Sequence, residues 1–106
     1  MTDGLDRLFA TIAARKAADP GTSYTAKLLA AGVEKCAKKF GEEATEAVIA
    51  AIQKDKAELA EESADVLYHL AVLWAASGIT PEEVYAVLRS REGMSGLEEK
   101  ASRSKR

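Results

Sequence analysis

Residues 33–76 read VEKCAKKFGEEATEAVIAAIQKDKAELAEESADVLYHLAVLWAA, and this stretch decides the fold. It is rich in Ala, Leu, Glu and Lys, which favour helix, and it contains no Pro. The polar run QKDK at 53–56 divides it into two parts. We therefore predict helices over Val33–Gln53 and Ala57–Ala76, joined by a turn short enough for an antiparallel hairpin.

Helix-boundary residues divide the rest of the chain. A first helix is predicted over Asp3–Ala18, because Asp19-Pro20-Gly21 ends it. Ser23 is a candidate N-cap for a short helix that runs to Ala31 and is closed by Gly32. Thr80 followed by Pro81 and Glu83 predicts a capping box at the start of a last helix, which ends near Gly93 or Gly96.

The predicted fold is all-α, an antiparallel bundle of four to five helices in one domain spanning residues 1–106. In the second central helix, the side chains predicted to point inward are Leu59, Val66, Leu67, Leu70, Leu73 and Trp74. Residues 97–106 carry several basic and Ser residues and are expected to form a flexible tail.

Composition narrows the class of protein. The chain has 106 residues, 47% of them hydrophobic, and a net charge of −2, which offers no basic field for nucleic acid. No apolar run approaches the ~20 residues of a membrane span and no leader pattern opens the chain, so we expect a cytoplasmic protein without a membrane partner. Cys36 is the single cysteine, which excludes an intrachain disulfide.

Acidic residues recur at matched spacings on the two central helices. Glu43 and Glu46 are three residues apart, as are Glu62 and Asp65, so each pair shares one helix face. The two pairs are mirror images about position 54, inside the polar turn. In an antiparallel hairpin the helical rise puts both pairs at the same height, about 12 Å from the turn. Four carboxylates are therefore predicted to converge.

Such a cluster needs compensation. Two like charges about 4 Å apart repel by about 4 kcal/mol at an effective dielectric constant near 20, so the site needs protons, basic partners or a cation. All-oxygen ligation suits Mg²⁺, with Mn²⁺ as an alternative. The competing interpretation is that Glu-rich helices simply present a solvated face.

Basic residues lie just before the acids. Mg²⁺ in proteins commonly takes substrate phosphates among its ligands, so basic residues near the acids can contact those phosphates. The candidates are Lys35, Lys38 and Lys39. The alternative is a solvated basic patch that forms helix salt bridges. His69 follows the second acidic pair, and its role stays open between a structural residue and a base or ligand.

Two motifs resemble a known family. KFGEEATE at 39–46 and ESADVLYHL at 62–70 are similar to the EExxE and ExxD signature of the all-α MazG-like nucleotide pyrophosphohydrolases, and most similar to the branch that acts on phosphoribosyl-ATP. The similarity extends to SYTAKLL at 23–29 and SGLEEKAS at 95–102, and so covers nearly the whole chain.

The resemblance implies an enzyme of histidine biosynthesis, built as a homodimer. It would hydrolyse the α–β phosphoanhydride of 1-(5-phosphoribosyl)-ATP, a small nucleotide, to 1-(5-phosphoribosyl)-AMP and pyrophosphate. The implied Mg²⁺ ligands are Glu43, Glu46, Glu62 and Asp65. Glu42 would either support the metal ligands without touching the metal or help orient the attacking water, and Glu43 is also a candidate catalytic residue. Our own candidates for holding phosphate oxygens are Lys38 and Lys39, with Lys35 as a third.

Two other functions are compatible with the same residues. One is a house-cleaning nucleoside triphosphate pyrophosphohydrolase, which would share the metal chemistry but select a different substrate. The other is a noncatalytic helical interaction module in which the acidic residues only form a hydrated surface.

Overall fold

The computed structural model describes residues 3–93, and within them the chain is helical without any strand. This confirms the predicted all-α class. The elements in chain order are α1 (Asp3–Ala14), the 3₁₀ turn η1 (Arg15–Ala17), α2 (Tyr24–Ala31), α3 (Val33–Ile52), α4 (Lys56–Ser77) and α5 (Pro81–Ser90). No helix in this part of the chain is long and apolar enough to span a bilayer.

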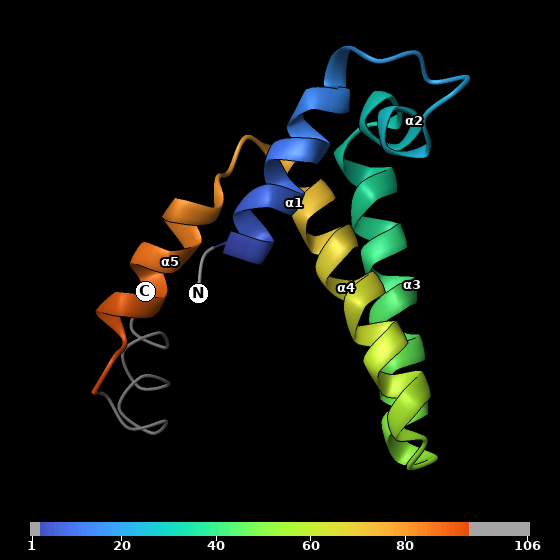
Figure 1. Cartoon of the computed structure of the whole chain (residues 1–106), viewed down its shortest axis with the longest axis vertical. Coiled ribbons are helices and arrows are strands. Elements are labelled where there is room, and N and C mark those ends of the chain that lie inside the picture. The colour runs from blue at the N-terminus through green and yellow to red at the C-terminus, as the bar shows by residue number, and fades with distance from the viewer. Residues whose placement is uncertain (1–2, 94–106) are drawn as a thin grey trace.

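The long α3–α4 hairpin dominates the molecule (Figure 1). Its turn is tight, because Lys54 adopts a left-handed φ of 60° and Asp55 immediately caps α4. The Asp55 carboxylate accepts a hydrogen bond of 3.0 Å from the backbone N–H of Glu58. The cap fixes where α4 begins, and therefore which of its residues face α3.

Local capping explains most of the other helix boundaries. Ser23 accepts a hydrogen bond from the backbone N–H of Ala26, and Thr80 forms the predicted capping box with Glu83. The left-handed Gly78, with φ of 79°, ends α4. Gly93 has a left-handed φ of 85° beyond the end of α5, whereas Gly96 and the expected tail at 97–106 lie outside the described residues.

The first helix is shorter than predicted. We expected it to reach Ala18, but the α-helix ends at Ala14 and a single 3₁₀ turn follows. The backbone N–H of Ala18 bonds to the carbonyl of Arg15, and Ala18 itself is extended. The ring of Pro20 disfavours a helical backbone at Asp19, the residue before it, so the helix cannot continue through this position.

The core lies at the end of the hairpin that α1 and α2 cover. Its buried residues come from four helices and are Ile12, Leu28, Cys36, Ala71, Val72 and Ala75. The Cys36 thiol donates to the Leu28 carbonyl at 3.3 Å, which ties α3 to α2. Burial raises the pKa of this thiol, which keeps it protonated and unreactive.

One core assignment was wrong. Leu67 was predicted to point inward, yet 45% of its surface is exposed in the single chain. Buried α4 residues cluster around Val72, and at 100° per residue Leu67 points about 140° away from it.

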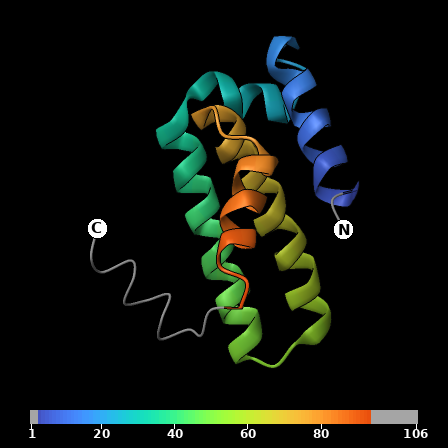
Figure 2. The same cartoon turned by 90° about the vertical axis from the view of Figure 1, so that its left-hand side faces the viewer.

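Helix α5 stands apart from the hairpin in Figure 1, whereas in the view of Figure 2 it lies in front of the hairpin, and it contacts α1. The Tyr85 hydroxyl donates to the Asp6 carboxylate at 3.3 Å, linking these two helices. The outer side of α5 remains open, with Val87 and Leu88 both exposed.

Candidate metal centre

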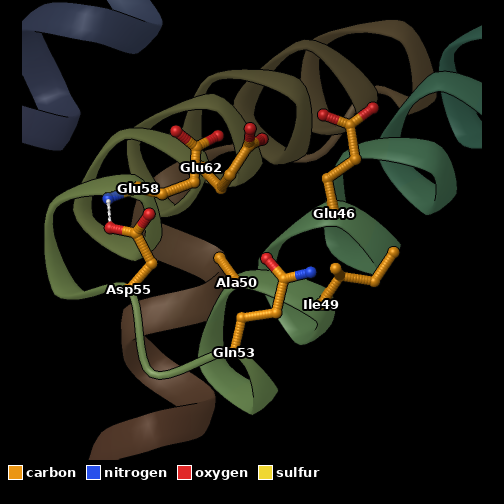
Figure 3. Close-up of a pocket in the computed structure, with 7 residues that line it drawn as sticks. All are labelled: Glu46, Ile49, Ala50, Gln53, Asp55, Glu58 and Glu62. Carbon is orange, nitrogen blue, oxygen red and sulfur yellow. Dashed lines mark hydrogen bonds between the residues drawn. The ribbon is translucent and has the colours of Figure 1, made fainter.

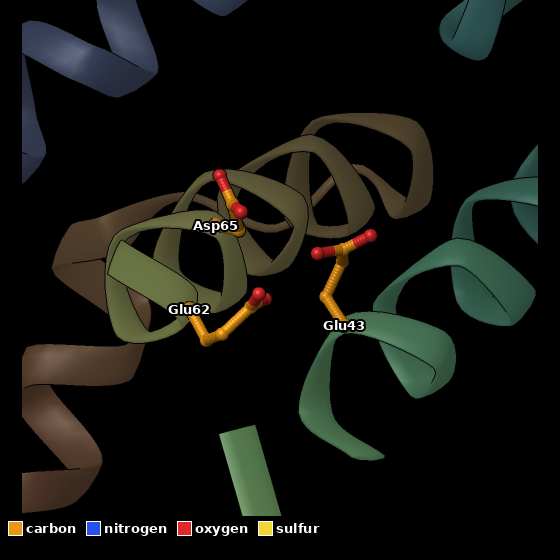
Figure 4. A group of neighbouring side chains, drawn as sticks. All are labelled: Glu43, Glu62 and Asp65. Atoms are coloured by element: carbon orange, nitrogen blue, oxygen red, sulfur yellow. The ribbon is translucent and has the colours of Figure 1, made fainter. Parts of the chain in front are cut away.

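Three carboxylates meet between the two arms of the hairpin. Glu43 projects from α3, and Glu62 and Asp65 project from α4 toward it (Figure 4). One oxygen of each lies within 4.8 Å of the others. The antiparallel register thus brings together three of the four acids predicted from the mirrored spacing, and the group is open to solvent on the side of Asp65.

Glu46, the fourth predicted acid, lies outside this group of three. It lines a pocket of about 330 Å³ toward the hairpin turn, together with Glu58 and Glu62 (Figure 3). Glu62 therefore belongs both to the three-carboxylate group and to the pocket. Glu58 was not among the predicted site residues, although its position four residues before Glu62 places both on one face of α4.

Electrostatic crowding is strongest at Glu62. The neighbouring Glu58 carboxylate, partial burial and the nearby Glu46 raise the pKa of Glu62 to about 7. Its Oε1 is buried without a hydrogen-bond partner among the described residues. A buried, unpartnered carboxylate oxygen beside two further carboxylates fits a hard divalent cation, which would favour the ionised form.

This raised pKa predicts how stability depends on pH when no divalent cation is present. The unfolded side chain titrates near pH 4.3, so between that pH and about 7 the folded state binds the extra proton. The contribution of Glu62 to the free energy of unfolding is therefore full below that range and falls as pH rises through 7. Urea denaturation in chelator at pH 5, 6, 7 and 8 measures the effect.

The matched variant is Glu62→Gln, which cannot titrate. Burial lowers the pKa of His69, and that shift acts in the opposite direction by raising stability as pH increases. The difference between wild type and variant cancels this contribution. A difference that stays constant from pH 5 to 8 would contradict the raised pKa.

The predicted basic residues separate in the structure. Lys39 forms an ion pair with Glu42 at 3.2 Å, which raises the pKa of Lys39 and lowers that of Glu42. Glu42 therefore stays ionised, and it lies outside the group of three carboxylates. Lys35 and Lys39 line a second pocket with Lys27, whereas Lys38 is exposed and is not among the residues that line it.

His69 is buried, with 6% of its surface exposed, behind the acids on α4. Tyr68 and Tyr24 make T-shaped contacts with its ring, with ring centroids 5.0 Å and 6.4 Å away. Its Nδ1 has no hydrogen-bond partner within residues 3–93. The hydroxyls of Tyr68 and Thr25 share a hydrogen bond that holds α2 against α4 beside it.

Comparisons with known proteins identify the family and several relatives of this chain. Residues 5–92 match the family model described as phosphoribosyl-ATP pyrophosphohydrolase. A relative from Cereibacter sphaeroides named phosphoribosyl-ATP pyrophosphatase is 64% identical over 93% of this chain and 96% of its own length. Relatives of the same name from Parvibaculum lavamentivorans and Paracoccus denitrificans are each 63% identical, over 96% and 94% of this chain and 94% and 93% of theirs.

Proposed function

The chain belongs to the phosphoribosyl-ATP pyrophosphohydrolase family and is a hydrolase of histidine biosynthesis, and we propose that it works through a divalent cation held between α3 and α4. The reaction splits phosphoribosyl-ATP into phosphoribosyl-AMP and pyrophosphate. The observation that supports the metal is the convergence of Glu43, Glu62 and Asp65 around a buried, unpartnered carboxylate oxygen.

The proposed cation is Mg²⁺, with Mn²⁺ as a substitute, because every donor is a carboxylate oxygen. Glu43, Glu62 and Asp65 would hold it, and Glu46 would join them from the adjoining pocket. When bound, the cation supplies positive charge to the phosphoryl group under attack, which is the main need of such chemistry.

The remaining roles fall to side chains around the three acids. Glu42 is kept ionised by Lys39, and we assign it to accepting a hydrogen bond from the attacking water and orienting it, with Glu43 alongside. Lys38 and Lys39 would hold oxygens of the triphosphate, and Lys35 would contact a phosphate further along α3. His69, neutral and buried, is left without a chemical role.

A homodimer is the proposed assembly. Several large apolar side chains of the hairpin are exposed in the single chain, namely Val48, Ile49, Ile52 and Leu67. Ile52 is 73% exposed, and covering its apolar surface in a dimer would lower the free energy of the assembly. Sedimentation equilibrium should give the mass of two chains, and a monomer at micromolar concentration would contradict the proposal.

We also propose a cytoplasmic location. The substrate is a highly charged nucleotide that does not cross membranes unaided, so the enzyme has to work in the compartment where this nucleotide is made.

A substrate panel tests the function. Purified protein is offered phosphoribosyl-ATP, ATP and noncanonical triphosphates with Mg²⁺, and pyrophosphate release is measured. We expect the highest kcat/KM for phosphoribosyl-ATP and loss of turnover in chelator. A preference for noncanonical triphosphates would instead support the house-cleaning function, and absence of any metal-dependent release would support the noncatalytic module.

A further inference from the structure

A second pocket, distinct from the acidic one, lies between α2 and α3. Its volume is about 250 Å³, and the described residues that line it are Tyr24, Lys27, Leu28, Ala31, Lys35 and Lys39. Three of these six carry an ammonium group and none is acidic, while Leu28, 3% exposed, belongs to the buried core. A concave surface with three cations and no carboxylate is suited to an anion.

Charge changes sign along one face of α3. Lys35, Lys39 and Glu43 follow each other at intervals of four residues, so they lie on one helix face. At about 1.5 Å per residue, Lys39 lies about 6 Å and Lys35 about 12 Å along the axis from Glu43. A single elongated molecule lying along this face would meet the acids with one end and the ammonium groups with the other.

Phosphoribosyl-ATP carries two separate anionic groups. Its triphosphate is the group that a cation at the three acids would neutralise. Its other phosphate is a monoester on the second ribose, nearly a dianion at neutral pH and separated from the triphosphate by the adenine ring and both sugars. The acidic pocket beside Glu46 and Glu58 would repel this monoester, so it requires a cationic site of its own.

We propose that the pocket between α2 and α3 binds the phosphate monoester of the second ribose, with Lys27 and Lys35 as its ligands. This inference rests on the proposed function and adds a specificity site to it. Lys39 is already paired with Glu42, and it lies between the sites for the two anionic ends of the substrate. Tyr24 packs edge-on against His69 and lines the pocket, so it closes the side that faces α4.

The test compares two substrates with two single variants, Lys27→Met and Lys35→Met. The substrates are phosphoribosyl-ATP and the same nucleotide lacking the remote phosphate. A charge-assisted hydrogen bond is worth about 10- to 100-fold in affinity. Each variant should therefore raise KM for phosphoribosyl-ATP by about that factor with little change in kcat, and leave kcat/KM for the dephosphorylated nucleotide unchanged.

Lys56→Met is the matched control. Lys56 is an exposed lysine at the first position of α4, at the opposite end of the hairpin, and its loss should affect neither substrate. Ribose 5-phosphate provides a second measurement: in NMR titrations it should shift α2 amide signals of wild type, and do so at least tenfold more weakly in Lys27→Met.

The outcomes separate two kinds of failure. Equal loss on both substrates, or no loss on either, would overturn the assignment of this pocket while leaving the hydrolase function intact. Failure of wild type to hydrolyse phosphoribosyl-ATP would overturn the function itself. Both lysines are exposed, so we expect the variants to fold, and circular dichroism checks this.

Discussion

Replacement of Glu62 by Gln is expected to lower kcat/KM for phosphoribosyl-ATP by about 10³-fold, or about 4 kcal/mol of transition-state stabilisation. Glu62 belongs both to the three-carboxylate group and to the pocket that contains Glu46 and Glu58. Gln keeps the volume of the side chain but removes the charge that would hold the cation. Pyrophosphate release measures the activity, and calorimetric Mg²⁺ titration measures the affinity.

Stability distinguishes this role from a structural one. Because Glu62 is crowded by Glu58 and Glu46, its neutral replacement should raise the urea midpoint in chelator above pH 7, where the wild-type carboxylate is ionised, while abolishing the extra stability that Mg²⁺ gives to wild type. Glu61→Gln is the matched control. Glu61 is the exposed neighbour of Glu62 on α4 and lies outside the group, so this variant should keep full activity. Unchanged turnover and Mg²⁺ dependence in Glu62→Gln would refute the proposed centre.

Features that depend on nearby residues were predictable from the sequence. Ser23 and Thr80 cap the helices that follow them because their side chains reach backbone N–H groups only three residues away. The meeting of Glu43 with Asp65 also followed from counting, because a tight turn at position 54 leaves one antiparallel register. Two regular helices then carry that register outward without further information.

Features that depend on how helices rotate against each other were not predictable. Whether Glu46 or Glu58 lies nearer to Glu62 depends on the start of α4 at Asp55 and on the azimuth of each helix, which spacing does not give. The pocket of Lys27 and Lys35 requires α2 to fold back beside α3 after Gly32, and the sequence predicts both helices without their angle. Leu67 shows the same limit, since an apolar residue can serve a core or an interface.

Ile12→Ala is the second large effect that we expect, with a loss of about 2–5 kcal/mol in the free energy of unfolding. Ile12 is 1% exposed and packs α1 into the cluster formed with Leu28, Cys36 and Val72. Truncation leaves a cavity where three other helices meet, so collapse around it is limited. For a domain of this size the melting temperature should fall by roughly 10 °C or more, measured by circular dichroism.

The same substitution at Ile52 gives the contrast that makes the result interpretable. Ile52 is 73% exposed, so within one chain its truncation should cost no more than about 0.5 kcal/mol. If a second copy covers Ile52, the cost appears instead as a melting temperature that depends more steeply on protein concentration, because dissociation then precedes unfolding. Ile12→Ala should lower stability equally at all concentrations, since its contacts are within the chain. If Ile12→Ala melts at the wild-type temperature, α1 does not seal the core. In that case α2, which packs on the same cluster, would lack the support that positions Lys27 beside α3.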